Sequence, residues 1–505
     1  MTKPIWPKIP ARFVSSMLAG HSALGLAFAA LMYVLCISGT LLVPTAELAR
    51  WENPTVPITT HMPPATIARM LETGVQIAAE QGINDYIVAT PPAADAPYAS
   101  LRIMDFTTGA ETIYNVDGQG NLLGERREGA LHFIEHLHIN LHMPQMIGLT
   151  LVGLAGVALL ASVVSGTLSH PRIFRDAFTF RRGGSRRLQE ADLHNRLSVW
   201  ALPFHIAVPF TGALLGLSAI ILGTLAMAAF DGDMSRARAT IGGPVFAEDP
   251  APAPLPQIVP AIESALAKHP EARLQRVALY KAGEKGQSFL VALHMPRDLT
   301  LSEQYFYDGE GNLAGSRGFA DGPAGAQLIA ALGPLHFGWF GGWPVKIAYV
   351  LLGLGLTAII STGVTIWIAR RKDKGKPVPG WERAWYALVW GQPISYCAIA
   401  LTSLFGLHLP EIPFYLGVCL LAFVPAFLAP APLAVSRYLR IVLGLMLIAL
   451  PVLHALRYAP EGITDPAAWI VNASLLLSAA LVLGSIRLPW PTRKFAEHAP
   501  AIDSR

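Results

Sequence analysis

Eight long apolar stretches dominate the sequence, and each has about 20 residues or more. They lie at 22–44, 146–169, 197–229, 344–369, 385–407, 412–433, 438–457 and 467–486. At ~1.5 Å per residue, a helix of this length crosses the ~30 Å hydrocarbon core of a bilayer. The composition agrees, because 52% of the residues are hydrophobic and only 14% are charged. The sequence therefore predicts a polytopic α-helical membrane protein with about eight transmembrane helices.

Basic residues gather in alternate short loops, and this pattern predicts the orientation. Arginines and lysines are frequent in 170–187, 370–383, 437–440 and 487–494, whereas the opposite short loops at 408–411 and 457–466 carry one Arg between them. Loops rich in Lys and Arg stay in the cytoplasm. Both termini are therefore predicted to be cytoplasmic, and the long polar segments 45–143 and 230–342 to lie outside. This bias accounts for the net charge of +4 without a nucleic-acid partner.

The two outside segments resemble each other. The stretches "YNVDGQGNLLGER" at 114–126 and "YFYDGEGNLAGSR" at 305–317 share a D-G-x-G-N-L-x-G-x-R frame. Gly and Asn in such a frame supply the positive φ angles that a hairpin turn needs. Each stretch follows a helix-like segment, at 65–82 or 257–270, and β-rich runs. Each outside segment is predicted to be one helix packed on a small antiparallel sheet, with the two domains side by side.

The surrounding helices repeat as well. In each copy, a histidine near a helix start is followed at a matched distance by a glycine within a Ser-Gly or Thr-Gly pair. The four combinations are His21 with Gly39, His194 with Gly212, His138 with Gly166, and His336 with Gly363. Residues 1–370 are therefore predicted to be two copies of one unit, consisting of helix, outside domain and helix. The last four helices match neither copy.

These features define the expected segments. They are the cytoplasmic N-terminus with the first helix at 1–44, outside domain 1 at 45–143, the second and third helices with a basic loop at 144–229, outside domain 2 at 230–342, the fourth helix at 343–372, and a C-terminal extension of four helices with a cytoplasmic tail at 373–505.

Several classes of chemistry lack their sequence signatures. The chain contains no G-x-G-x-x-G after a strand, no Walker A motif, no G-x-S-x-G and no H-E-x-x-H. Cys36, Cys397 and Cys419 lie inside apolar runs, which does not indicate a disulfide framework or a cysteine metal site. No catalytic acid, base or nucleophile is predicted.

The motifs and their order resemble the PepSY-associated transmembrane proteins, also called iron-regulated membrane proteins or siderophore reductases. The resemblance rests on "HSALGL" (21–26), "LHINLHMP" (137–144), "LHNRLSVWALPFH" (193–205), "PLHFGWFGG" (334–342) and the two D-G-x-G-N-L turns, and it covers about residues 10–372. It implies two periplasmic PepSY-like α+β domains, a location in the bacterial inner membrane, haem b as cofactor and reduction of a periplasmic ferric siderophore or other ferric chelate. Electrons would then come from a cytoplasmic reductase or from membrane quinol.

Haem b held between helices usually has two axial histidines, and histidine inside a membrane is costly enough to suggest a function. His21 and His194 occupy equivalent positions near the cytoplasmic boundary, whereas His138 or His142 and His336 lie near the outer boundary. We therefore expect two haems, one held by each pair. His205 follows His194 by eleven residues on the same helical face and is an alternative ligand.

Other interpretations of the same residues stay open. Single boundary histidines can lie at the interface without a ligand, and His132 with His136 could hold zinc or copper. The repeated glycines could admit a flat porphyrin or simply allow close helix packing. At the level of function, the alternative is a membrane protein without redox activity whose PepSY domains sense a ligand or regulate a peptidase.

Overall fold

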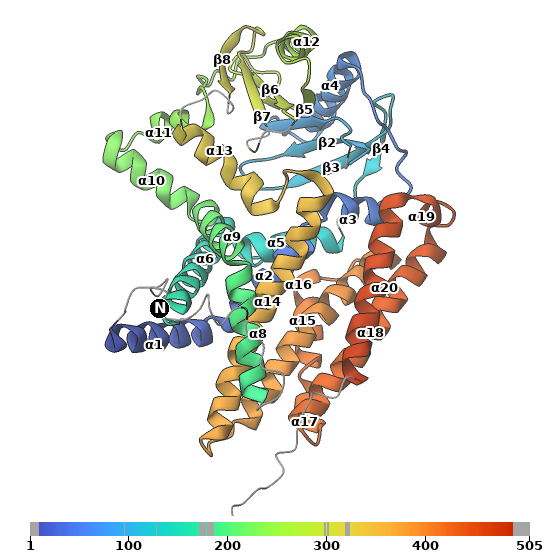
Figure 1. The fold of residues 1–505 in the computed structure, drawn as a ribbon. Coiled ribbons are helices and arrows are strands. Elements are labelled where there is room, and N and C mark those ends of the chain that lie inside the picture. The colour runs from blue at the N-terminus through green and yellow to red at the C-terminus, as the bar shows by residue number, and fades with distance from the viewer. Residues whose placement is uncertain are drawn as a thin grey trace, which may run out of the picture.

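The computed structural model describes residues 10–487 apart from 95, 128, 171–177, 179–185, 297–298, 300–301 and 319–323. A β-sheet domain lies at one end of a large helix bundle (Figure 1). Helices α4 (Pro64–Glu80) and α12 (Ile258–Lys268) cover the face of the sheet that points away from the bundle. Two short helices, α3 (Thr45–Glu52) and α5 (Ala130–Asn140), lie between the sheet and the bundle.

Among the described residues, six helical stretches are long and apolar enough to cross a membrane, and the number rises to eight if two bent pairs are each counted as one span. The six are α6 (Gln145–Leu168), α14 (Gly342–Asp373), α15 (Pro379–Phe405), the stretch Glu411–Leu428 made of α16 (Glu411–Leu421) and α17 (Val424–Leu428), α18 (Pro432–Arg457) and α20 (Pro466–Arg487). The prediction of a multi-pass membrane protein is confirmed at this level.

The two bent pairs belong to the repeat. Helices α1 (Ala11–Ala27) and α2 (Ala29–Leu41) meet at an angle of 70°, and α8 (Arg186–Trp200) and α9 (Leu202–Gly216) meet at 71°. This corrects the third predicted span, 197–229. Its helix begins earlier, breaks at Ala201 and ends at Gly216, and α10 (Ser218–Ala229) is a separate short helix. Pro203 in the first turn of α9 has no N–H to continue the hydrogen bonding of α8.

The two outside segments form one sheet instead of two. Its eight antiparallel strands are ordered β4-β3-β2-β1-β5-β6-β7-β8. The strands are β1 (Tyr86–Thr90), β2 (Ala99–Met104), β3 (Glu111–Val116), β4 (Leu122–Glu125), β5 (Arg273–Tyr280), β6 (Ser288–His294), β7 (Ser302–Tyr307) and β8 (Leu313–Gly318). The halves join where β1 pairs with β5, in a register that sets Tyr86 opposite Tyr280. This pairing satisfies two strand edges that separate domains would expose.

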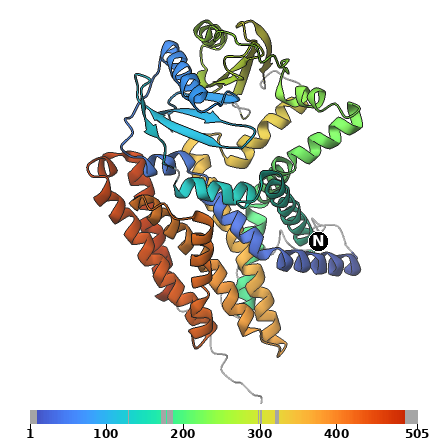
Figure 2. The ribbon, with the colours of Figure 1, turned by 180° about the vertical axis from the view of Figure 1, so that it is seen from behind.

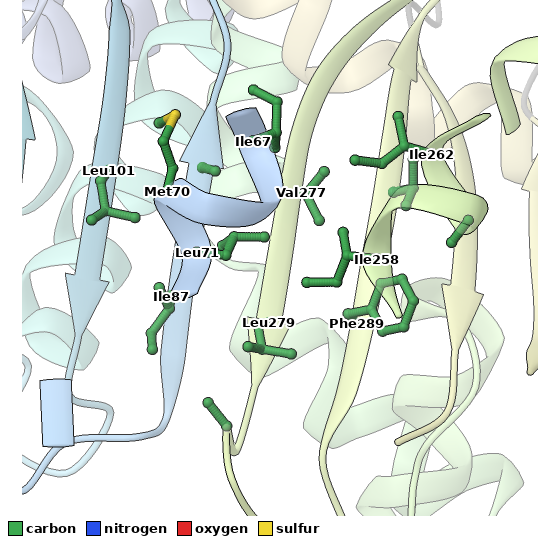
Figure 3. Packing of buried hydrophobic residues seen from close by; sticks show 14 of the residues in the cluster. Ile67, Met70, Leu71, Ile87, Leu101, Ile258, Ile262, Val277, Leu279 and Phe289 are labelled. Carbon is green, nitrogen blue, oxygen red and sulfur yellow. The ribbon is translucent and has the colours of Figure 1, made fainter. Parts of the chain in front are cut away.

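A single core lies beneath α4 and α12. Ile67 and Leu71 of α4 meet Ile262 of α12 and strand residues such as Leu101 and Val277 in one buried cluster (Figure 3). The predicted hairpin turns join β3 to β4 and β7 to β8. In both turns an aspartate, Asp117 or Asp308, accepts hydrogen bonds from the backbone N–H groups two and four residues later.

The membrane helices of the two copies exchange partners. Helix α1 packs on α6 and α8 packs on α14, each within its own copy, whereas α2 packs on α14 and α9 packs on α6, across the copies. Two further elements of the second copy, α11 (Met234–Gly242) and α13 (Ala324–Phe337), connect the bundle to the sheet.

The C-terminal extension consists of α15 to α20, including the short α19 (Glu461–Thr464). It lies beside α2, α3 and α5 of the first copy, on the side of the bundle opposite α1 and α10 (Figure 2). The arginines at 172, 175, 181 and 182, which contribute to the predicted orientation, lie outside the described residues.

Candidate functional site: two facing histidine pairs

Each of the four repeat-related histidines lies against one of the four repeated glycines. The imidazole of His138 on α5 lies on Gly39 of α2, where a methyl group added to the glycine would come within 2.6 Å of the ring. The other three contacts join His21 to Gly166, His336 to Gly212 and His194 to Gly363, at 2.9, 2.8 and 3.5 Å by the same measure. The glycines therefore receive imidazole rings, a role that the prediction of porphyrin or helix contacts did not include.

The same four rings are held by the same hydrogen bond. Nδ1 of each histidine lies near the backbone carbonyl four residues before its glycine. The acceptors are Leu35 for His138 at 3.0 Å, Ser162 for His21 at 2.9 Å, Ile359 for His194 at 3.1 Å and Val208 for His336 at 3.2 Å. Because a carbonyl can only accept, Nδ1 carries the proton and Nε2 keeps a free lone pair.

Three of the rings make a second contact through the hydroxyl group that precedes the glycine. The Nδ1 atom of His138 lies 3.2 Å from Ser38 Oγ. The Nδ1 atoms of His194 and His336 each lie 3.1 Å from a threonine hydroxyl, that of Thr362 and that of Thr211 respectively. Sequence reasoning noted these Ser-Gly and Thr-Gly pairs but assigned them no function. Their recurrence in front of all four glycines is the signal from which an imidazole cradle could have been predicted.

Each histidine of one copy faces its counterpart in the other copy. The ring centroids of His21 and His194 are 6.2 Å apart with an interplanar angle of 73°, and those of His138 and His336 are 6.2 Å apart at 29°. Two imidazoles on opposite sides of one metal ion place their ring centres about 6 Å apart, because each Nε2 lies ~2.0 Å from the metal and ~1.1 Å from its own ring centre. Both pairs therefore fit two-histidine axial coordination.

Burial favours the neutral, metal-binding form at the second pair. Desolvation, with a smaller contribution from His336, lowers the pKa of His138 to about 4, and desolvation also lowers the pKa of His336. At neutral pH both rings therefore keep the Nε2 lone pair that a metal requires.

The bend in each broken helix separates the two sites. Phe28 and Ala201, where the helices break, lie seven residues after His21 and His194. The segment before the break supplies a histidine to the first pair. The segment after the break supplies the glycine, Gly39 or Gly212, that supports a ring of the second pair.

His142 does not face His336. Helix α5 ends at Asn140, and Leu141 and His142 adopt left-handed φ angles of 57° and 53°. This turn directs Nε2 of His142 to the carbonyl of Phe133 at 2.9 Å. Because the helix ends between them, His138 and His142 do not share a helical face. Of the two candidates, the geometry favours His138.

His205 lies outside both pairs. It is 1% exposed on α9, its nearest aromatic contact is Phe204, and Nε2 has no hydrogen-bond partner in the described part of the chain. His132 and His136 lie with ring centroids 4.4 Å apart, and His136 and His142 are 5.9 Å apart. No group of three or more His, Cys, Asp or Glu side chains suited to one metal ion occurs among the described residues.

A buried carboxylate supports the helix that carries His138. Glu52 of α3 accepts a hydrogen bond from the backbone N–H of Leu131 at 3.0 Å, at the first turn of α5. Desolvation raises the pKa of Glu52 to about 7 and nearby Glu411 raises it slightly, against lowering contributions from the α5 N–H groups and Arg126. The carboxylate is favoured by the helix N-terminus but disfavoured by burial.

This balance predicts a pH-dependent stability. The folded protein holds the Glu52 proton up to about pH 7, whereas the unfolded chain releases it near pH 4.3. Stability should therefore fall between about pH 4.5 and 7 by about 1–2 kcal/mol, after allowance for partial solvent screening. Thermal unfolding of wild type and Glu52→Gln should give midpoints that diverge between about pH 4.5 and 7 and keep a constant difference above pH 7, with the glutamine variant more stable there. A difference between the two unfolding midpoints that stays constant from pH 5 to 8 would contradict the raised pKa of Glu52.

The fold and the site define a class of multi-pass membrane protein with an internal two-fold repeat and two facing histidine pairs. The family described as PepSY-associated TM region matches residues 18–370, and the chain belongs to this family. An uncharacterised protein of Pseudomonas aeruginosa is 32% identical over 257 residues, and the match covers 46% of this chain and 63% of that relative.

Proposed function

We propose that this protein is a haem-b electron-transfer protein of the bacterial inner membrane that reduces ferric siderophores or other ferric chelates at the periplasmic side. The proposal gives one haem to His21 and His194 and a second to His138 and His336. The observation that carries it is the pair of 6.2 Å ring separations, combined with Nδ1 bonds that leave every Nε2 unprotonated.

A bound haem b supplies one-electron exchange between the ferric and ferrous states. The chain contributes the rest of the function by holding two imidazoles on each iron. Hydrogen bonds from Nδ1 to carbonyls fix the orientation of the rings and make them better donors to the metal. With His21 and His194 holding one haem and His138 and His336 the other, no position would remain for direct binding of substrate to the haem iron. The substrate then needs only to approach the haem edge, which agrees with the lack of a predicted catalytic acid, base or nucleophile.

Residues around the second pair suit such an approach. Trp339 is 55% exposed and stacks on Phe337, whose ring is in edge contact with His336. His132, His136 and His142 form a half-buried cluster on the other side, beneath the sheet. A chelate too polar to enter the bilayer could reach this junction between sheet and bundle. The alternating basic loops support placing the junction in the periplasm.

Each ferric chelate takes up one electron and releases Fe(II), which oxygen ligands bind less tightly than Fe(III). The first pair, His21 and His194, is positioned to receive electrons from a cytoplasmic reductase or from membrane quinol and to transfer them to the second pair. Two one-electron reductions would use both electrons of one quinol, with two protons released.

An anaerobic reoxidation experiment tests the function. Purified protein should show a b-type spectrum, and dithionite-reduced protein freed of excess reductant should be reoxidised by added ferric siderophore. A chromogenic Fe(II) chelator should trap about two Fe(II) per chain. A His61→Ala variant, which changes an exposed histidine of the sheet domain, serves as the control and should behave like wild type.

The same experiment separates reduction from sensing. If several chemically different ferric chelates leave the reduced spectrum unchanged over minutes, the protein is not a ferric-chelate reductase. If the purified protein contains no haem, the sensing alternative gains support.

A further inference from the structure

We infer that the C-terminal extension holds α3 and α5 in place and thereby positions His138, whereas α13 and His336 are held by α9 and α14 of the repeat. The effect of this positioning role on a bound haem rests on the proposed function. The mechanical part, which is the fixing of α5 by the extension, rests on contacts between described residues alone. It gives a role to the four helices that match neither copy of the repeat.

Buried polar contacts fasten α3 to the extension. Arg50 Nε donates to Asp465 Oδ2 at 2.6 Å, and both side chains are 5% exposed. Trp51 Nε1 donates to Asn472 Oδ1 at 2.9 Å. The imidazole of His454 stacks on Trp51 with ring centroids 4.5 Å apart, and its Nε2 donates to the Trp51 carbonyl at 2.7 Å.

Helix α3 is also fixed to the bundle and to α5. Lys346 of α14 donates to Glu47 at 2.9 Å in a buried ion pair. At the end of α3, Glu52 accepts from the N–H of Leu131 in the first turn of α5. A buried ion pair that loses one member leaves an uncompensated charge, so these contacts tolerate little displacement. A displacement of α18 or α20 would therefore move α3, and α3 would in turn move the first turn of α5.

The extension contacts α5 directly as well. Phe133, Ile134 and Leu137 of α5 are buried in one cluster with Tyr396, Ile399 and Tyr415 of α15 and α16. The rings of Phe133 and Tyr415 lie 5.0 Å apart. Tyr415 is held in turn by a 2.6 Å hydrogen bond to Gln392. His138 follows Leu137 directly, so this packing limits the motion of the ring that lies on Gly39.

In the second copy, α13 is held within the repeat instead, where Tyr349 of α14 donates a hydrogen bond to the Leu335 carbonyl at 2.7 Å. Helix α13 packs on α9, and Leu328 and Ile329 are 59% and 43% exposed. In contrast, Phe133 and Ile134 of α5 are 0% and 6% exposed. The two axial histidines of the second pair are therefore held unequally, with His138 on a packed helix and His336 on a more exposed one.

Hydrogen–deuterium exchange of the full-length protein in detergent tests the mechanical part, because it does not depend on bound haem. Asn472→Ala removes the acceptor of Trp51, and Asp465→Asn weakens the pair with Arg50. Each should raise amide exchange in α5 at least tenfold and leave α13 unchanged. Ser436→Ala removes a 3.0 Å hydrogen bond from Trp390 inside the extension and should leave α5 unchanged.

Carbon monoxide binding tests the redox consequence. A ferrous haem with two firmly held histidines binds carbon monoxide poorly, because no coordination position is open. Loosening His138 should let about one haem per chain bind carbon monoxide at least tenfold faster than in wild type or Ser436→Ala. Unchanged α5 exchange in both variants, or equal increases in α5 and α13, would overturn the inference. A wild-type protein without haem would instead overturn the proposed function. The hydrogen–deuterium exchange result would then decide alone whether the extension positions α5.

Discussion

Replacing His336 by alanine is expected to lower the haem content from about two to about one per chain and to slow ferric-chelate reduction at least tenfold. His336 faces His138 with ring centroids 6.2 Å apart, and the first pair shares no ligand with the second. Loss of one axial imidazole should therefore empty one site and leave the other intact. The haem that remains would be held by His21 and His194, which lie on the other side of the helix breaks from Gly39 and Gly212.

Electron paramagnetic resonance of the oxidised protein can identify which haem is lost. The His21 and His194 rings are steeply inclined, at 73°, whereas those of His138 and His336 are inclined at 29°. Two low-spin ferric signals are therefore expected, a strongly anisotropic one from the first pair and a more rhombic one from the second. His336→Ala should remove the rhombic signal and His194→Ala the other.

His205→Ala provides the matched control for these variants. His205 is as buried as a ligand, but it lies outside both pairs. Both signals should survive in this variant. Loss of either signal would assign a ligand role to His205 and refute the proposed pairing. Full haem retention in both His194→Ala and His336→Ala would refute the pairing as well.

Valine at Gly39 is expected to disrupt the second haem site even though no ligand is changed. A methyl group at Gly39 would come within 2.6 Å of the His138 ring, which is closer than van der Waals contact allows. Overpacking of this kind costs typically about 1–3 kcal/mol, which corresponds to a loss of roughly 5- to 150-fold in haem affinity if the ring is displaced. Haem retention during gel filtration in the presence of competing apomyoglobin measures this loss.

The chain offers internal controls for this experiment. Gly25→Val introduces the same change on the same broken helix at a position with nothing within 4 Å, and it should retain both haems. Gly212→Ala and Gly363→Ala form a second comparison, because an added methyl group would lie 2.8 Å from His336 but 3.5 Å from His194. Only the first should weaken haem binding. Equal retention in all four variants would show that the glycines do not position the rings.

The sequence was informative wherever the relevant pattern is local. The repeated spacings from His21 to Gly39 and from His194 to Gly212 predicted which histidines are equivalent, and the structure brings these equivalents face to face. The D-G-x-G-N turns likewise predicted both hairpins, because Asp117 and Asp308 bond their own backbones.

Features that depend on distant pairing could not be predicted in the same way. The single sheet depends on β1 meeting β5, whose residues Tyr86 and Tyr280 lie 194 positions apart in the chain. The choice between His138 and His142 depends on where α5 ends, and Leu141, the first residue after the helix, is not a residue type that favours the left-handed φ angle found there. The bend at Phe28 has no proline or glycine at the break to announce it.

The antiparallel pairing of β1 with β5 has a consequence for how such a chain could arise. Each imidazole lies on a glycine of its own copy but faces an imidazole of the other, so one copy holds half of each site. Antiparallel joining of equivalent strands is also the arrangement that a two-fold axis produces between identical subunits. A shorter ancestral protein with a single copy would therefore have formed these histidine pairs only as a homodimer, and gene duplication with fusion would have made that assembly permanent.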